Sequence, residues 1–162
     1  AIQLQVKAAL NYDKLLAKLR NSEGERSIRN QQNALITSLN LRLNGVSKKR
    51  TRLYEDYAEG LLDEAEYSFA KKSYDEQYAD LSRRLDEAVQ RRSKFDEAMS
   101  VDNKWITLMK SVSTATQLSQ DLVDESVELV KVHEGGAVEL VMKYGDIYEL
   151  TIQSIKEVQE AM

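Results

Sequence analysis

The sequence contains no cysteine and no proline, and its single histidine is His133. Without cysteine the chain can form no disulfide and no thiolate zinc site, and it has no thiol nucleophile. A lone histidine cannot build a metal site with histidine partners. The absence of proline, together with only 6 glycines and a charged fraction of 31%, is typical of long helices with charged outer faces.

Long apolar runs and the common catalytic signatures are also missing. No stretch approaches the ~18 apolar residues that a membrane-spanning helix needs. There is no glycine-rich phosphate loop and no nucleophile beside a base, so we expect this chain to be no enzyme and to bind no cofactor. The chain begins at Ala1 rather than methionine, and its first residues alternate between apolar and polar types. We therefore expect a piece of a longer protein rather than a signal peptide.

The chain is slightly acidic, with a negative net charge. It is −4 at pH 7, with an isoelectric point near 5.2. A protein that binds DNA by itself usually presents a basic face. The charge balance therefore argues against a free-standing DNA-binding domain, but it leaves open DNA binding by a neighbouring domain.

What the sequence does contain is the repeat of an antiparallel coiled coil. Apolar residues recur at alternating spacings of three and four residues in two segments, about 28–59 and 64–99, which is the pattern of an a/d seam. Arg50 is a charged residue within the first series, and its aliphatic stem can extend out of the seam. The first series is Ile36, Leu39, Leu43, Val46, Arg50, Leu53 and Tyr57; the second is Tyr74, Tyr78, Leu81, Leu85, Ala88, Arg92, Phe95 and Met99.

The two segments are joined by a short turn with strong capping signals. Gly60 suits the left-handed position that ends a helix. Asp63 and Glu66 have the spacing of a capping box, and Leu62 and Tyr67 have that of a hydrophobic staple. So short a connection makes the two helices antiparallel neighbours. We predict an arm over residues 27–99 with its tip at about 58–63.

The residues outside this arm predict a small base. Residues 1–26 form a helix and a linker, with a break at 21–24 in which Gly24 is the punctuation and Ser27 caps the next helix. In residues 100–162, Asp102 caps a short helix that contains Trp105, the expected anchor of the core. A polar loop follows at 111–117.

The rest of the base predicts a β-hairpin between two helices. Ser119 caps a helix that runs to about Glu128, with Leu118 and Val123 as a staple. Residues 128–143 alternate around Glu134-Gly135-Gly136, which is a hairpin signal that places Val138, Leu140 and Met142 on one face. Asp146 and Glu149 then suggest a capped last helix, with a third strand over 147–152 as the alternative. The predicted fold is mainly α: a long antiparallel coiled-coil hairpin projecting from a small α+β base with one β-hairpin.

Several charged residues have both a functional and a purely structural interpretation. The acidic residues near the turn are better explained as helix caps or solvated side chains than as acid–base catalysts. His133 is better explained as a surface turn residue than as a ligand. Lys48, Lys49 and Arg52 could contact DNA phosphates. The acidic Glu55 and Asp56 follow at once, so an ordinary solvated helix face is the favoured interpretation.

The tip of the predicted arm carries more apolar surface than a turn requires. Some of these residues belong to the seam, but others have no evident place inside the hairpin, which favours a surface for a protein partner over simple packing of the tip. The candidate interaction residues are Tyr54, Tyr57, Leu61, Leu62, Tyr67 and Phe69.

Three segments together resemble the large serine recombinases, the site-specific integrases and transposases of phages and mobile elements. LYEDYAEGLLDEAEYSFAKKSYDEQYADL (53–81) is similar to their coiled-coil hairpin, with the pattern LY-x-D-Y-x-x-G-x-(I/L)-x-x-x-E-Y. LSQDLVDESVELVKVHEGGAVELVMKYGD (118–146) is similar to the segment that follows the coil, and AIQLQVKAALNYDKLLAKL (1–19) to the helix that leaves the zinc ribbon. The resemblance covers nearly the whole chain in the right order.

The resemblance implies a non-catalytic C-terminal part of a cytoplasmic DNA recombinase. The catalytic serine and the zinc of the ribbon would lie in domains upstream of this chain, and those domains would bind the DNA attachment site. The arm would contact other recombinase subunits through its tip and so control synapsis and the direction of recombination. An accessory directionality factor is a further implied partner. The alternatives are a structural coiled-coil tether and an arm that binds DNA directly.

Overall fold

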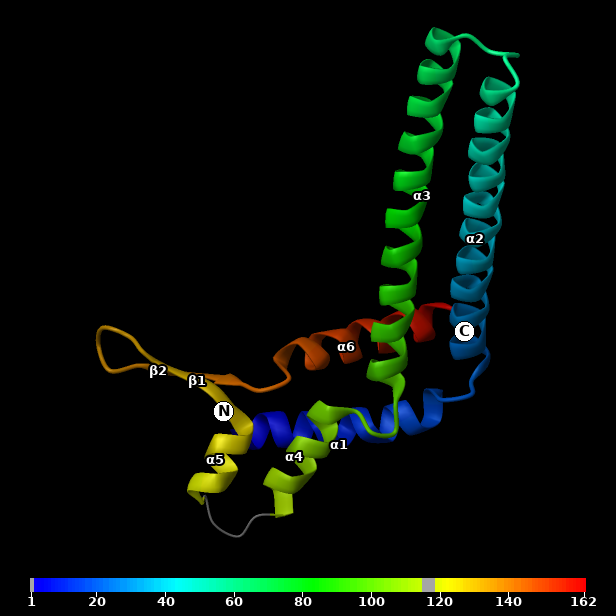
Figure 1. Cartoon of the computed structure of the whole chain (residues 1–162). Coiled ribbons are helices and arrows are strands. Elements are labelled where there is room, and N and C mark those ends of the chain that lie inside the picture. Colours follow the sequence, from blue (N-terminus) through cyan, green and yellow to red (C-terminus); the bar gives the residue numbers. More distant parts are fainter. Residues whose placement is uncertain (1, 115–118) are drawn as a thin grey trace. The chain divides into compact units, whose positions relative to one another are not determined.

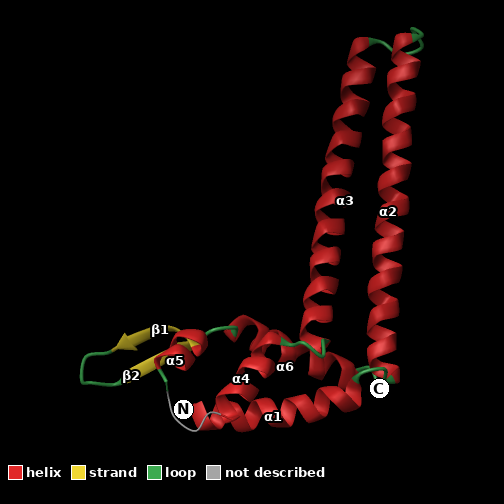
Figure 2. Ribbon diagram, turned by 60° about the horizontal axis from the view of Figure 1, so that its bottom comes forward, coloured by secondary structure: helices red, strands yellow, loops and turns green. Residues whose placement is uncertain are grey.

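The computed structural model describes residues 2–114 and 119–162 and is mainly α-helical (Figures 1 and 2). It forms two compact units, one of residues 29–92 and one of the described residues before and after them. We call these units the arm and the base. The elements are α1 (Ile2–Leu19), α2 (Glu23–Ala58), α3 (Glu64–Met99), α4 (Lys104–Thr114), α5 (Gln120–Ser126), β1 (Val127–Val132), β2 (Val138–Met142) and α6 (Gly145–Glu160). None of the described helices is long and apolar enough to cross a membrane.

The arm is the predicted antiparallel hairpin of α2 and α3, which lie side by side in both views (Figures 1 and 2). The a/d positions form its core: Leu39, Val46, Leu81 and Ala88 are buried. Ile36, Leu43, Tyr74, Tyr78 and Leu85 pack against them and are partly exposed. The 4–3 spacing of apolar residues thus identified the seam correctly.

The base contains a denser core around Trp105, which is 2% exposed. Its ring packs against those of Tyr12 and Tyr148, at centroid distances of 6.0 and 4.7 Å, and the two tyrosine rings are 6.4 Å from each other. Leu16 and Met109 are fully buried beside it. Trp105 is therefore the core anchor that the sequence predicted.

The end of α3 belongs to the base, although the sequence analysis assigned residues 27–99 to the arm. Phe95 and Met99 are 3% and 2% exposed and are part of the core around Trp105. The Arg20 guanidinium also donates to the carbonyls of Met99 and Ser100, at 2.8 and 2.6 Å.

The break between α1 and α2 is shorter than predicted. Helix α2 begins at Glu23, so Gly24 lies inside its first turn and Ser27 is not its cap. The Ser22 hydroxyl instead accepts the Glu25 N–H at 3.2 Å. A Cβ on Gly24 would stand 2.2 Å from the Val158 carbonyl oxygen of α6. Glycine is therefore required by a close helix–helix approach and not by a turn.

Two further caps differ from those predicted. Asn103, not Asp102, caps α4, because its Oδ1 accepts the Ile106 N–H at 3.1 Å. Helix α6 begins at Gly145 without a side-chain cap from Asp146, after Tyr144 in a left-handed conformation with φ of 60°. The alternative strand over 147–152 is helical instead.

The β-hairpin predicted over 128–143 is present, with strands β1 over Val127–Val132 and β2 over Val138–Met142. Strands β1 and β2 pair antiparallel, with Val130 opposite Leu140 and Val132 opposite Val138. Gly135 and Gly136 have φ of 100° and 82° and form the turn. The preceding helix α5 ends at Ser126 rather than near Glu128, while α4 continues through Thr114, into the predicted loop 111–117. The rest of that loop and Leu118 lie outside the described residues.

Candidate functional site

The tip of the arm is a turn closed by backbone and side-chain hydrogen bonds. Gly60 has φ of 76°, and its N–H bonds to the Tyr57 carbonyl at 3.0 Å. The Leu61 N–H bonds to the Asp56 carbonyl at 2.9 Å, which completes a Schellman motif. These bonds satisfy carbonyls that would otherwise be unpaired at the end of α2.

The return helix starts with the predicted capping box. The Glu66 N–H donates to Asp63 Oδ1 at 2.8 Å, and the Asp63 N–H donates to Glu66 Oε2 at 3.0 Å. The two carboxylates therefore cap the N-terminal end of α3. The turn of 59–63 is thus fixed at both ends, and the residues on it are held in defined positions.

The candidate interaction residues divide into two groups. Tyr57 and Tyr67 stack across the hairpin, with ring centroids 4.3 Å apart and ring planes 17° apart. Leu62 is half-buried beside this turn. These three residues shape the tip, although Tyr57 is still 37% exposed.

The other three candidates are exposed. Tyr54 is 63% exposed, Leu61 67% and Phe69 80%. Leu61 lies in the turn, whereas Tyr54 and Phe69 lie on α2 and α3, one to two turns behind it. The structure therefore assigns the outward apolar surface to Leu61 and not to Leu62, a choice that sequence spacing left open.

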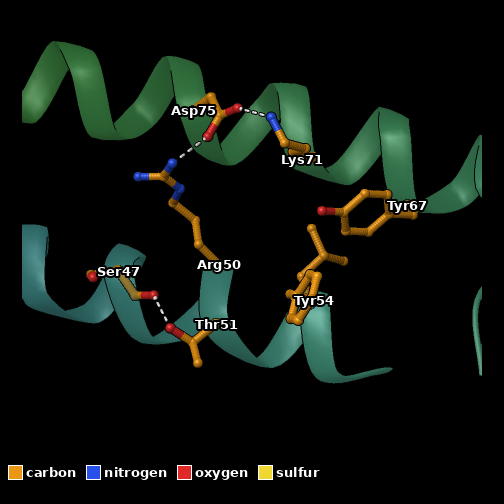
Figure 3. A pocket seen from close by; sticks show the side chains of 8 residues that line it. Ser47, Arg50, Thr51, Tyr54, Tyr67, Lys71 and Asp75 are labelled. Carbon is orange, nitrogen blue, oxygen red and sulfur yellow. Dashed lines mark hydrogen bonds and ion pairs between the residues drawn. The ribbon is translucent and has the colours of Figure 1, made fainter. Parts of the chain in front are cut away.

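A polar cluster interrupts the seam behind the tip (Figure 3). Arg50 Nη2 lies 2.9 Å from Asp75 Oδ1, and Lys71 Nζ lies 2.7 Å from Asp75 Oδ2. The Arg50 guanidinium is also 4.9 Å from the centroid of the Tyr78 ring. Arg50 therefore has partners on α3 rather than only solvent. Sequence reasoning missed Asp75, although an arginine at an a/d position is a signal to look for a carboxylate on the facing helix.

This cluster shifts the titration of its members. The hydrogen bond from Lys71, and then its charge, hold the pKa of Asp75 below its usual value. The hydrogen bond to Asp75 and the charge of Asp75 raise the pKa of Lys71. The open cavity beside them has a volume of about 370 Å³ and is also lined by Tyr54 and Tyr67. Because its cations are already paired with Asp75, the cluster fits a structural role better than anion binding.

The predicted phosphate-contacting residues Lys48, Lys49 and Arg52 are all exposed on α2. Arg52 Nε lies 4.0 Å from Asp56 Oδ2, at the limit of an ion pair. Their exposure is compatible with contacts to DNA and equally with a solvated helix face, so the phosphate contacts stay a prediction.

The base contains a buried polar network that sequence reasoning also missed. The Asn103 amide donates to the Ala98 carbonyl at 2.9 Å and to the Thr151 hydroxyl at 2.8 Å. Thr151 in turn donates to the Ile147 carbonyl at 2.6 Å. Every one of these polar groups has a partner, so the network joins α4 to α6 and has no atom left to act on a ligand.

Another pair of interacting titratable groups lies on the β-hairpin of the base. His133 is 2.9 Å from Glu139 on the exposed β-hairpin, and its hydrogen bond, followed by that of Lys131, lowers the pKa of Glu139. Within residues 2–114 and 119–162 no group of three or more His, Asp or Glu side chains could hold a metal ion. The tip of the arm, with its exposed apolar side chains, is the strongest candidate site among the described residues.

Comparison of the chain with protein-family models, with curated proteins and with solved structures found no match.

Proposed function

We propose that this chain is the non-catalytic C-terminal part of a site-specific DNA recombinase of the large serine recombinase type. In this proposal the α2–α3 arm mediates contacts between subunits bound at different DNA sites, and these contacts control synapsis and the direction of recombination. Catalysis, zinc binding and recognition of the attachment site belong to domains outside this chain. The proposal rests on the three-segment resemblance of 53–81, 118–146 and 1–19.

One observation carries the assignment of the contact surface. Tyr54, Leu61 and Phe69 expose between 63% and 80% of their surface at the end of the arm. The turn that carries Leu61 is closed by a Schellman motif and a capping box, and Tyr54 and Phe69 lie on the helices that it joins, so little backbone entropy remains to be lost when a partner binds. Exposed aromatic and aliphatic residues on a rigid support are typical of the centre of a protein interface.

The experiment uses the whole recombinase with Leu61→Ser and Phe69→Ser combined. We expect normal binding to a single attachment site and at least ~10-fold less synaptic complex, because the substitutions remove apolar contact between subunits. Leu41→Ser is the matched control, since Leu41 is 68% exposed on the same arm but distant from the tip along α2. Loss of site binding in the tip variant, or equal loss of synapsis in the control, would contradict the proposal.

The coding sequence upstream of Ala1 provides a second and simpler test. The proposal requires a serine recombinase catalytic domain and a zinc ribbon with its cysteines there. If the upstream sequence encodes neither, the recombinase assignment fails, whatever the arm binds. A structural tether is then the remaining interpretation.

Direct DNA binding by the arm is the second candidate, favoured by the exposure of Lys48, Lys49 and Arg52. It predicts that the isolated chain binds DNA and that its affinity falls steeply with salt concentration. The acidic Glu55, Asp56 and Glu59, one turn further along α2, would repel the same phosphates. Subunit contact therefore accounts for more of the arm than DNA contact does.

A further inference from the structure

The outer face of α2 carries a stripe of charges near its end. Lys48, Arg52, Glu55 and Glu59 follow one another at spacings of four, three and four residues, and all four are exposed. Glu59 directly follows Ala58, the last residue of α2, and its N–H still bonds to the Glu55 carbonyl at 2.9 Å. This spacing places them on one face of the helix, away from the seam positions Val46, Leu53 and Tyr57. We call these four residues the charge stripe. From Lys48 towards the tip, the four charges are positive, positive, negative and negative.

The order of these charges is unfavourable within an isolated helix. Lys48 and Arg52 are like charges four residues apart, and so are Glu55 and Glu59, which destabilises a helix. Carboxylates at the C-terminal end of a helix also oppose its macrodipole, and the last turn of α2 contains no basic residue. At the start of α3, by contrast, Glu66 completes a cap. Arg52 does have favourable neighbours, Glu55 three residues further on and Asp56, whose Oδ2 lies 4.0 Å from its Nε. The stability of α2 therefore explains only part of the stripe.

The same order is complementary to itself when two helices run antiparallel. If a two-fold axis passes at the level between Leu53 and Tyr54, Lys48 of one copy lies opposite Glu59 of the other. Arg52 then lies opposite Glu55, and the symmetry repeats both pairs, as an isologous interface requires. Tyr54 is level with this axis but lies about 100° around the helix from Glu55, where it lines the cavity shared with Tyr67 of α3, so it is outside the docking face.

We propose that a second copy of this chain docks antiparallel along the charge stripe, so that the tip of each arm overlaps the arm of the other. This inference rests on the proposed function, since it names the geometry of the subunit contact. The occupant is a second copy because an antiparallel copy presents minus, minus, plus, plus in the matching order. A polyanion would be attracted by one half of the stripe and repelled by the other. Exposed ion pairs are weak, so the contact suits arms that are already concentrated by their DNA-bound domains.

The test is a charge exchange followed by mixing. The variant K48E/R52E makes the stripe entirely acidic, and the variant E55K/E59K makes it entirely basic. Each variant should repel its own copy, whereas an equimolar mixture restores opposite charges at every position. Thr51→Cys, placed in this cysteine-free chain and in both variants, reports the antiparallel contact through crosslinking with a short bismaleimide at low salt, because Thr51 is exposed at the border of the stripe and close to the axis.

We expect efficient crosslinking with the native stripe and in the mixture, and about tenfold or greater reduction for either variant alone. High salt should reduce the crosslinking of the native stripe and of the mixture alike. The matched control combines Arg42→Glu with Lys72→Glu, two exposed cations of the arm outside the stripe, and should leave crosslinking unchanged. Circular dichroism confirms that each variant stays helical.

The outcome separates this inference from the proposed function. A mixture that crosslinks no better than either variant alone, or no crosslinking with the native stripe, overturns the antiparallel docking. If, in addition, Leu61→Cys crosslinks strongly, the subunits meet end to end, and the proposed function stands without the stripe. If neither position crosslinks and tip substitutions leave synapsis intact, both proposals fail.

Discussion

The base and the arm bury their apolar residues in different ways. In the base, Trp105, Leu16 and Met109 are at most 2% exposed and are surrounded on all sides. In the arm, a single line of residues such as Leu39 and Leu81 is buried between two helices. The base has a three-dimensional core, whereas the arm has a seam. We infer that the base holds most of the stability of the fold and that the arm has outer surface available for partners.

The exposed residues show the same contrast. Helices α2 and α3 carry large apolar side chains on their outer faces, and the most exposed of them is Phe69, near the tip. The outer faces of a two-helix hairpin are not covered by a further layer of structure, so these side chains stay in contact with solvent. Because these residues do not contribute to the seam, they can change without loss of the hairpin. The surface can therefore be adapted to one specific partner.

The largest effect is expected from Trp105→Ala in the base. Removing a buried indole leaves a cavity next to Tyr12 and Tyr148, and such truncations cost about 3–5 kcal/mol. Urea unfolding followed by circular dichroism measures the change. Val101→Ala is the control, because Val101 is 72% exposed and should change stability by less than ~0.5 kcal/mol. A loss below about 1 kcal/mol for Trp105→Ala would contradict the idea that this core dominates the base.

The second prediction concerns the seam. Leu81→Ala should cost about 2–3 kcal/mol, the lower part of the usual range, because solvent borders the seam on both sides and can fill the gap. Hydrogen exchange should show the loss of protection in residues 29–92, while amides around Trp105 stay protected. Leu41→Ala, on the exposed side of α2, is the matched control and should have little effect. Equal loss of protection in both units would show that the seam and the base core unfold together.

Local sequence patterns predicted the seam and the tip because both depend on nearby residues. The 4–3 repeat identified the a/d positions, and Gly60, Asp63 and Glu66 close the turn with bonds to residues only a few positions away. The fold class could therefore be predicted from sequence. Which leucine of the turn points outward could not, because that depends on the final path of the backbone.

The errors fall where distant parts of the chain meet. Gly24 looked like a helix break, but it is required because α6 approaches α2 at that point. Asn103 replaces Asp102 as a cap because an amide can also donate to Thr151, 48 residues away. The pairing of Arg50 with Asp75 likewise depends on the register of the two helices, which a heptad pattern does not fix by itself.

A third prediction tests the tip turn with two glycines of the arm. Gly60 has φ of 76°, so Gly60→Ala should destabilise the arm by about 1 kcal/mol. Gly45 lies within helix α2 with no atom near its missing Cβ, so Gly45→Ala should stabilise it by up to ~1 kcal/mol. Thermal unfolding of the two variants compares the opposite signs directly. If both substitutions shift the midpoint in the same direction, the turn geometry described for Gly60 is wrong.

The smallest effect is expected from Asp75→Asn, which removes the carboxylate shared by Arg50 and Lys71. The pKa of Asp75 is lowered in the folded chain, so its contribution is present above its unfolded pKa and is lost as pH falls through the lowered value. The pKa of Lys71 is raised, so its contribution is lost only as pH rises through that value, in the alkaline range. The stability difference between the native chain and the variant should therefore be present at neutral pH and vanish in strong acid. Unfolding of the arm, followed by hydrogen exchange at several pH values, measures it, with Glu76→Gln as the control on the next residue. A difference that persists unchanged in strong acid would assign the role of Asp75 to packing and not to its charge.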